Sequence, residues 1–146
     1  RQGVEVNLHL SALIPNDYLP DVHSRLIMYK RISNASSDVE LRELQIEMID
    51  RFGLLPEQVK NLFEITSLKL RAEAMNITKI DAGPTHGRIE FATDAKVDPF
   101  KLVQLVQKQP QRYKLEGADK LRFSHSMEKT EQRFLAIESL LNDLSA

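Results

Sequence analysis

One predicted helix, over residues 56–76, carries apolar side chains on two nearly opposite faces, and this feature constrains the fold most. Its two apolar stripes consist of Val59, Leu62, Phe63 and Leu70, and of Ile65, Leu68, Ala72 and Met75. A helix that is apolar on two sides is normally packed on both. We therefore expect it to lie between the helices that precede it and the strands that follow it, with Asn76 as its C-terminal cap.

Two shorter helices are predicted before it, over residues 20–32 and 37–52. The second has well-marked ends. Ser37 and Glu40 have the spacing of a capping box, Gly53 can take the left-handed conformation that ends a helix, and Pro56 suits the first turn of the next helix. Its apolar stripe, which should face the core, consists of Leu41, Leu44, Met48 and Phe52.

Period-two alternation, which is typical of half-buried strands, occupies residues 4–11 and returns after residue 76. There it predicts strands over residues 77–82, 87–92, 112–116 and 120–125, with inward-pointing Ile89, Phe91, Tyr113, Leu115, Leu121 and Phe123. Residues 99–109 and 127–144 are predicted helices, the second capped by Ser126. The predicted fold class is α+β: a helical N-terminal half packed on a small mixed or antiparallel sheet, with one core and a C-terminal helix.

The composition is that of one ordinary globular domain. The chain has 146 residues, 42% hydrophobic content and a formal net charge of −1, so no global charge draws it to nucleic acid or to an anionic membrane. No apolar run approaches the roughly 20 residues of a membrane-spanning helix, and a cytoplasmic protein is expected. Because the chain begins Arg1-Gln2-Gly3 without methionine, we expect residues 1–146 to be a single domain from a longer, multidomain protein.

The residue types that carry catalysis are either absent or scattered. There is no cysteine, and no glycine-rich phosphate-binding loop, nucleophile elbow or HExxH zinc motif occurs. The four histidines, His9, His23, His86 and His125, do not have the spacing of metal ligands. We therefore expect no enzymatic activity, no metal and no cofactor in this chain.

A first candidate surface consists of Glu43, Glu47, Asp50 and Arg51, which fall on one flank of the second predicted helix, away from its apolar stripe. These carboxylates lack the convergent loop oxygens that calcium prefers, so a cation site is not predicted. Two interpretations remain open. The charges form either a solvated helix face, which is their usual role, or a mixed-charge surface that docks onto a complementary partner.

A second candidate surface lies on the later strands, where Arg88, Arg112, Lys114, Lys120 and Arg122 alternate with the inward apolar residues. Residues 77–126 contain nine Lys and Arg against six Asp and Glu, an excess of three positive charges. This sheet face is either solvated or in contact with nucleic acid or a partner protein. RNA recognition on a sheet uses exposed aromatic platforms, whereas here the strand aromatics share the inward parity.

Nearly the whole chain also resembles the C-terminal domain of the bacterial transcription-repair coupling factor. The most specific segments are IPNDYLPD with SRLIMYKRI, and IDRFG followed by LPEQVKNL. Four later segments resemble the same domain: KIDAGP, IEFA, KLVQLVQKQPQRYKLEG and KLRF. In that family the full-length protein is an ATP-dependent DNA translocase that displaces RNA polymerase stalled at a lesion and recruits nucleotide excision repair. Its motor and polymerase-binding activities belong to other domains.

The resemblance implies a regulatory role for this chain. The family's C-terminal domain packs against a domain near the N-terminus and masks the surface that recruits the damage-recognition ATPase of excision repair. It also restrains the motor until polymerase is engaged. On the matching IEMIDRFG segment, the resemblance implies that Glu47, Asp50 and Arg51, with Glu43 on the same flank, are polar contacts of this autoinhibitory interface. The alternative function is a free-standing nucleic-acid-binding module that uses the basic strand face.

Overall fold

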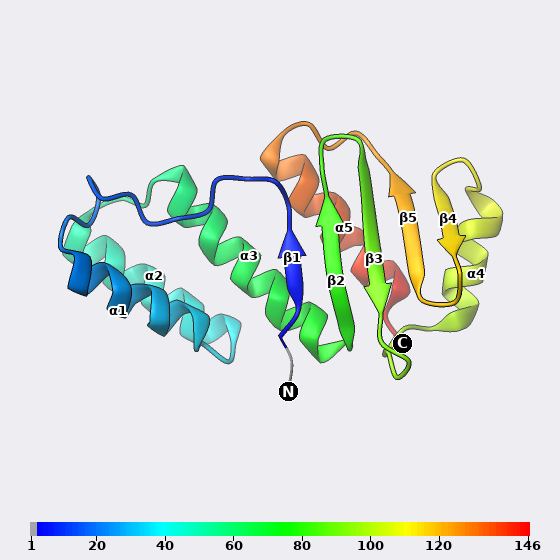
Figure 1. The fold of residues 1–146 in the computed structure, drawn as a ribbon, viewed down its shortest axis with the longest axis horizontal. Helices are drawn as coiled ribbons and strands as arrows, with labels where there is room; N and C mark the ends of the chain where they lie inside the picture. The colour runs from blue at the N-terminus through cyan, green and yellow to red at the C-terminus, as the bar shows by residue number, and fades with distance from the viewer. Residues whose placement is uncertain (1–2) are drawn as a thin grey trace. The chain divides into compact units, whose positions relative to one another are not determined.

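The computed structural model describes residues 3–146, which contain five helices and five strands (Figure 1). The helices are α1 (Val22–Ser33), α2 (Asp38–Phe52), α3 (Glu57–Ala74), α4 (Pro99–Lys108) and α5 (Thr130–Leu144). The strands are β1 (Glu5–Asn7), β2 (Ile77–Ala82), β3 (His86–Phe91), β4 (Tyr113–Glu116) and β5 (Lys120–Ser124). The elements form two compact units, a helical unit of residues 10–70 and a sheet unit that joins the residues up to His9 with residues 71–146.

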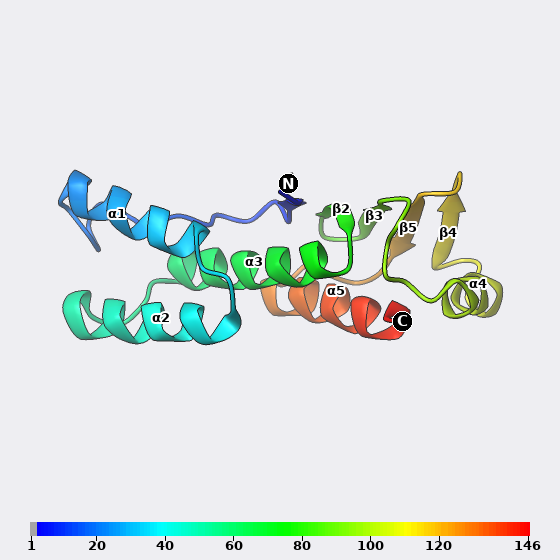
Figure 2. The same cartoon turned by 90° about the horizontal axis from the view of Figure 1, so that it is seen from below.

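The sheet unit contains a five-stranded mixed sheet with the strand order β1-β2-β3-β5-β4. β1 runs parallel to β2, and the other neighbouring pairs are antiparallel. α5 lies against one face of this sheet in both views (Figures 1 and 2). Ile80, Ile89 and Leu121 stand side by side on adjacent strands and, like Ile137 and Leu141 of α5, are fully buried. The predicted α+β class, with a mixed sheet and a C-terminal helix, is confirmed.

The helical unit is built from α1, α2 and the part of α3 up to Leu70. Asp21 caps α1 because its side chain accepts a hydrogen bond from the backbone N–H of Ser24. Ser37 caps α2 because its hydroxyl accepts one from the backbone N–H of Glu40. α2 ends at Phe52 and is followed by the C-cap residue Gly53, whose φ of 99° favours glycine. The core of the unit consists of Ile14, Leu19, Met28, Ile32, Ala35, Leu41, Leu44, Met48, Val59 and Phe63.

Two predicted helix starts are wrong, each for a local reason. The final helix begins at Thr130 rather than at Met127, and Lys129 rather than Ser126 is its N-cap residue. The residues before it do not join the helix because the backbone N–H groups of His125 and Met127 donate to the carbonyls of Thr85 and Pro84 in the β2–β3 turn. The first helix begins at Val22 because Asp21 caps it.

Two further predictions need correction. The strand predicted over residues 4–11 is only three residues long, because His9 has a φ of 55° and its N–H donates to the Asn7 side chain instead of a neighbouring strand.

The capping box predicted at the start of α2 is incomplete. Ser37 accepts from the Glu40 N–H, but the Glu40 carboxylate accepts from the backbone and hydroxyl of Ser36. Two predictions remain untested: that α3 packs on both of its apolar faces, and that the helical and sheet parts of the chain share a single core.

Candidate docking surface

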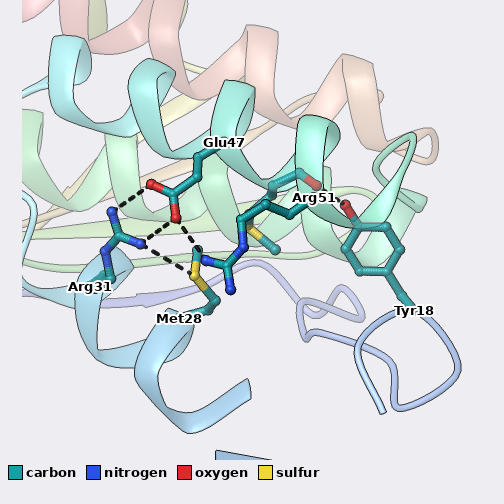
Figure 3. Close-up of polar contacts among 6 residues, drawn as sticks. Tyr18, Met28, Arg31, Glu47 and Arg51 are labelled. Carbon is teal, nitrogen blue, oxygen red and sulfur yellow. Dashed lines mark hydrogen bonds and ion pairs between the residues drawn. The ribbon is translucent and has the colours of Figure 1, made fainter. Parts of the chain in front are cut away.

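Glu47, in the third turn of α2, is held between two arginines (Figure 3). Arg31 of α1 donates from Nη1 to Oε2 at 2.6 Å and from Nη2 to Oε1 at 2.8 Å. Arg51, one turn further along α2, donates from Nη1 to Oε2 at 2.9 Å. A guanidinium that donates two parallel bonds to a carboxylate fixes its direction as well as its position. The Glu47 carboxylate is therefore oriented by residues of the helical unit itself.

The same contacts lower the pKa of Glu47 to about 2, first through the hydrogen bonds from Arg31 and then through that from Arg51. The carboxylate is consequently ionised throughout the neutral range, and Arg31 is stabilised in its charged form by Glu47. The side chain of Glu47 keeps 34% of its surface exposed, and those of Arg31 and Arg51 keep 42% and 50%. The three charges are thus fixed in position and still open to solvent.

The C-terminal end of α2 is held by aromatic contacts. The Arg51 guanidinium lies 4.8 Å from the ring centroid of Phe52, which in turn packs edge-on against Tyr18 at 6.0 Å. The Tyr18 hydroxyl donates to the backbone carbonyl of Gly53 at 2.8 Å, and burial raises the pKa of this hydroxyl. Because Tyr18 precedes α1 in the chain, this bond joins the N-terminal loop of the unit to the end of α2.

The structure divides the four predicted residues into two pairs. Glu47 and Arg51 lie in one ion-pair network with Arg31, whereas Glu43 and Asp50 are exposed and form no ion pair with any described residue. Arg31, the third member of the network, was not among the predicted residues. Periodicity within α2 describes only that helix, and the pairing of Arg31 with Glu47 depends on how α1 packs beside it. The usable signal was the position of Arg31 in the last turn of α1, where a cation is favoured.

An open groove of about 560 Å³ runs between α1 and α2. It is lined by Ile27, Lys30, Arg31, Asn34, Glu40, Glu43, Leu44 and Glu47. Ile27 and Leu44 are its apolar members, and the remaining lining is polar or charged. Glu40 is committed to Ser36, whose N–H lowers the pKa of the Glu40 carboxyl. The groove and the Glu47 network therefore form one continuous polar surface on the helical unit.

The basic strand residues gather on one face of the sheet unit, as predicted. Arg88, Arg122 and Lys114 stand directly opposite one another on β3, β5 and β4. Lys120 lies between Glu90 and Glu116 in the next row, and Arg112 lies just before β4. Like charges that face each other across strands are destabilising. The row of three cations is therefore an unusual feature of this sheet.

Carboxylates on the same face offset much of that positive charge. Arg88 pairs with Glu90 at 3.3 Å and Arg122 pairs with Glu116 at 3.4 Å. The sheet also offers no aromatic platform there, because Phe123 is 97% buried on the other face, where its ring covers Gly87. This arrangement lacks the aromatic stacking on which sheet-based recognition of single strands depends.

Within residues 3–146, no group of three or more acidic or histidine side chains is arranged to hold a metal ion. No helix in that part of the chain is both long and apolar enough to cross a bilayer.

The sequence is similar to that of a known protein family over most of its length. A family model described as the TRCF domain matches residues 8–102. The transcription-repair-coupling factor of Haemophilus influenzae is 44% identical over 146 residues, which are 100% of this chain and 13% of that protein. The protein of the same name from Escherichia coli K12 is 39% identical over 143 residues, 98% of this chain and 12% of that protein. The chain thus spans only a small part of the length of these relatives.

The fold also matches a known one. A crystal structure described as the C-terminal domain of transcription-repair coupling factor has a TM-score of 0.78 and 23% sequence identity with this chain. The match covers 97% of this chain and 94% of that one. The two chains therefore share a fold over nearly their whole length.

Proposed function

The chain belongs to the transcription-repair-coupling factor family, and we propose that it is a non-catalytic regulatory module of a longer parent protein. It docks onto a domain near the N-terminus of that parent and masks the surface that recruits the damage-recognition ATPase of nucleotide excision repair. It also restrains the parent's motor until RNA polymerase is engaged. The parent acts in the cytoplasm in transcription-coupled DNA repair, as an ATP-dependent DNA translocase whose activity resides in other domains.

The observation that carries this proposal is the fixed, exposed charge network around Glu47. Arg31 and Arg51 hold the Glu47 carboxylate at 2.6 to 2.9 Å while all three side chains remain open to solvent. Association costs free energy when flexible side chains must be ordered. A surface whose charges are already ordered by intradomain contacts avoids part of that cost, so it is suited to docking.

The same network suits a contact that must open again. Charged and polar groups at an interface contribute specificity and register more than raw affinity, and contacts between domains of one chain are commonly of this kind. Binding of the repair ATPase to the undocked form then shifts the population toward release. Docking is therefore reversible, and we call the docked contact the clasp. Its contacts include Glu47, Asp50 and Arg51, with Glu43 beside them.

A photo-crosslinking residue placed at Asp50 of the full-length parent tests the docking. We expect an intramolecular cross-link from this position to an N-terminal domain, and its loss when the repair ATPase is added in excess. The matched control places the same residue at Lys69, which is exposed on α3 of the same unit. Cross-linking that is equal at the two positions, or insensitive to the ATPase, contradicts the proposal.

The row formed by Arg88, Arg122 and Lys114 favours one second candidate, a contact of the sheet face with the phosphate backbone of nucleic acid. Phosphate contacts make binding fall steeply with salt. DNA binding by this chain that weakens strongly between low and physiological salt, and that is lost in Arg122→Ala, would favour this candidate over the clasp. The nearby Glu90 and Glu116 carboxylates argue against it.

A further inference from the structure

β1 is only three residues long and forms one edge of the sheet, where it pairs with β2 alone. It runs parallel to β2, and parallel pairing is slightly less stable per residue than antiparallel pairing. Figure 1 shows the beginning of the chain at the start of β1 and the link to the helical unit at its end. The two ends of this short strand are held by contacts of very different strength.

The C-terminal end of β1 is held firmly. Leu8, the residue after the strand, is 1% exposed, and its carbonyl accepts a hydrogen bond of 2.6 Å from Nη1 of Arg133. Arg133 belongs to α5 and is also buried, so water competes little for this charge-assisted bond. Nε2 of His9 lies 3.0 Å from Oδ1 of Asp81 on β2. We call these contacts at Leu8 and His9 the Leu8 clamp.

Among the described residues, the N-terminal end of β1 has weaker contacts. Glu5 pairs with Lys79 at 3.4 Å, but the Glu5 side chain is 68% exposed, and exposed pairs of this kind contribute little to stability. Val4 and Val6 are only half-buried, and an open cavity of about 330 Å³ adjoins Val4 and Glu5. Separation of β1 from the sheet should therefore begin at its first residue and end at the Leu8 clamp.

We infer that β1 is a releasable strap. It separates from β2 as far as the Leu8 clamp, while the other four strands and α5 stay folded. This inference rests on the proposed function and deepens it, because it states how the module leaves its docked position. In the proposed parent, the rest of the protein joins the module at the start of β1. Release of residues 3–7 lengthens that connection by roughly 17 Å, at about 3.4 Å per residue, so the module can undock without unfolding.

The Leu8 clamp gives the strap a defined end. Opening of residues 3–7 exposes side chains that are at most half-buried, and segments with few buried contacts open locally at low cost. Opening beyond Leu8 would expose a fully buried side chain and remove one acceptor from the buried guanidinium of Arg133. A buried charged group that loses a hydrogen-bond partner is costly. The two steps therefore differ sharply in free energy.

Hydrogen exchange of backbone amides in the 146-residue chain, resolved to single residues, tests the strap itself. Among amides that face a neighbouring strand, we expect those of β1 to exchange at least about tenfold faster than those of β2, β3 and β5. β4, the other edge of the same sheet, is the matched control and should exchange more slowly than β1. Equal protection of β1 and β4 overturns the inference.

Arg133→Lys tests the Leu8 clamp, because lysine keeps the charge but has a single donor group in place of the guanidinium fork. Fast exchange should then extend beyond Leu8, whereas Arg122→Lys on the exposed sheet face should leave its boundary at Leu8. An unchanged boundary in Arg133→Lys overturns the role of the clamp. The exchange pattern of the native chain decides on the strap even if this variant folds poorly.

Exchange in the full-length parent tests the link to undocking. We expect an excess of the damage-recognition ATPase to speed exchange in residues 4–7 and to leave β4 unchanged. Val6→Ala weakens the contact of β1 with the sheet and should tighten ATPase binding about threefold, because undocking becomes easier. Leu115→Ala, at a half-buried position of β4, is the matched control and should leave the affinity unchanged.

The outcomes separate this inference from the proposed function. Faster exchange in β1 alone, together with a gain in affinity for Val6→Ala but not for Leu115→Ala, supports the strap. Equal gains for the two variants overturn it. Loss of the Asp50 cross-link without any change in β1 exchange also overturns it and keeps the clasp. If the ATPase does not remove that cross-link, the proposed function fails, and exchange in the 146-residue chain still decides whether β1 opens as a strap.

Discussion

Arg31 and Glu47 form a two-bond ion pair between the last turn of α1 and the third turn of α2, with nitrogen–oxygen distances of 2.6 and 2.8 Å. Exposed ion pairs contribute little to stability, about 0 to 1 kcal/mol, because water screens them and ordering two long side chains costs entropy. The importance of this pair is therefore geometric. It fixes the Glu47 carboxylate relative to Arg51 and to the groove between the two helices.

The pKa of Glu47 should rise when Arg31 is removed. In the native protein the two arginines hold it at about 2, and the hydrogen bonds from Arg31 are the larger cause. We expect Arg31→Gln to move the pKa of Glu47 toward the usual glutamate value of about 4.3, and Arg51→Gln to move it less. An NMR titration that follows the side-chain carboxyl carbon of Glu47 measures its pKa in both variants. An unchanged pKa in Arg31→Gln would show that the pair does not form in solution.

The stability of the helical unit should also depend on pH through Glu47. Because its folded pKa is depressed, the unfolded chain binds the proton more readily. The contribution of Glu47 is therefore complete above about pH 4.5 and is lost as the pH falls toward 2. With a third of the side chain exposed, solvent screening limits this contribution to about 1 kcal/mol. Urea unfolding at pH 7 and pH 2.5 should show Glu47→Gln destabilising clearly at pH 7 and much less at pH 2.5, while Glu43→Gln serves as the control. Equal destabilisation by Glu47→Gln at both pH values would contradict the assignment.

Gly87 should not tolerate a side chain. A Cβ atom at this position would lie 2.1 Å from the Phe123 ring on the facing strand, so the ring or the backbone must move. We expect Gly87→Ala to destabilise the sheet unit by about 1 to 3 kcal/mol through overpacking. Gly83→Ala in the same hairpin is the control, since its nearest contact would be 4.0 Å away. Thermal unfolding compares the two, and equal melting temperatures would mean that Phe123 packs elsewhere.

Arg133 should act as a structural residue of the sheet unit. It is 96% buried, and its guanidinium donates to the backbone carbonyls of Leu8, Met127 and Glu128 at 2.6, 3.0 and 3.3 Å. Arg133→Met leaves these carbonyls without their donors, and we expect a loss of about 2 to 4 kcal/mol in the free energy of unfolding. Arg122→Met, on the exposed sheet face, should cost less than about 0.5 kcal/mol. Similar losses in the two variants would contradict the role of Arg133.

Elements with strong local signals could be predicted from the sequence. The caps at Ser37 and Gly53, and the alternation around Ile89 and Leu121, lead directly to α2 and to the central strands. The start of α5 could not be predicted in this way. Ser126 has a good capping side chain, but the segment that contains it is held by hydrogen bonds to Pro84 and Thr85, which lie at least 40 residues earlier in the chain than their donors. Long-range contacts of this kind override local preference.

The candidate surface was predictable only in part, for the same reason. Helical periodicity placed Glu43, Glu47, Asp50 and Arg51 away from the core of α2, and all four are at least partly exposed. It could not show that Glu47 and Arg51 belong to a network with Arg31, because that network depends on the packing of α1.

The central claim is that this domain masks a binding surface of its parent, and one binding measurement tests it most directly. Affinity of the damage-recognition ATPase would be measured for the intact parent, for the parent lacking this domain, and for the parent with alanine at Glu47, Asp50 and Arg51. We predict much tighter binding after deletion, and a gain in the same direction with the three alanines. Equal affinity for all three proteins would contradict masking, and a gain on deletion alone would move the contact away from this surface.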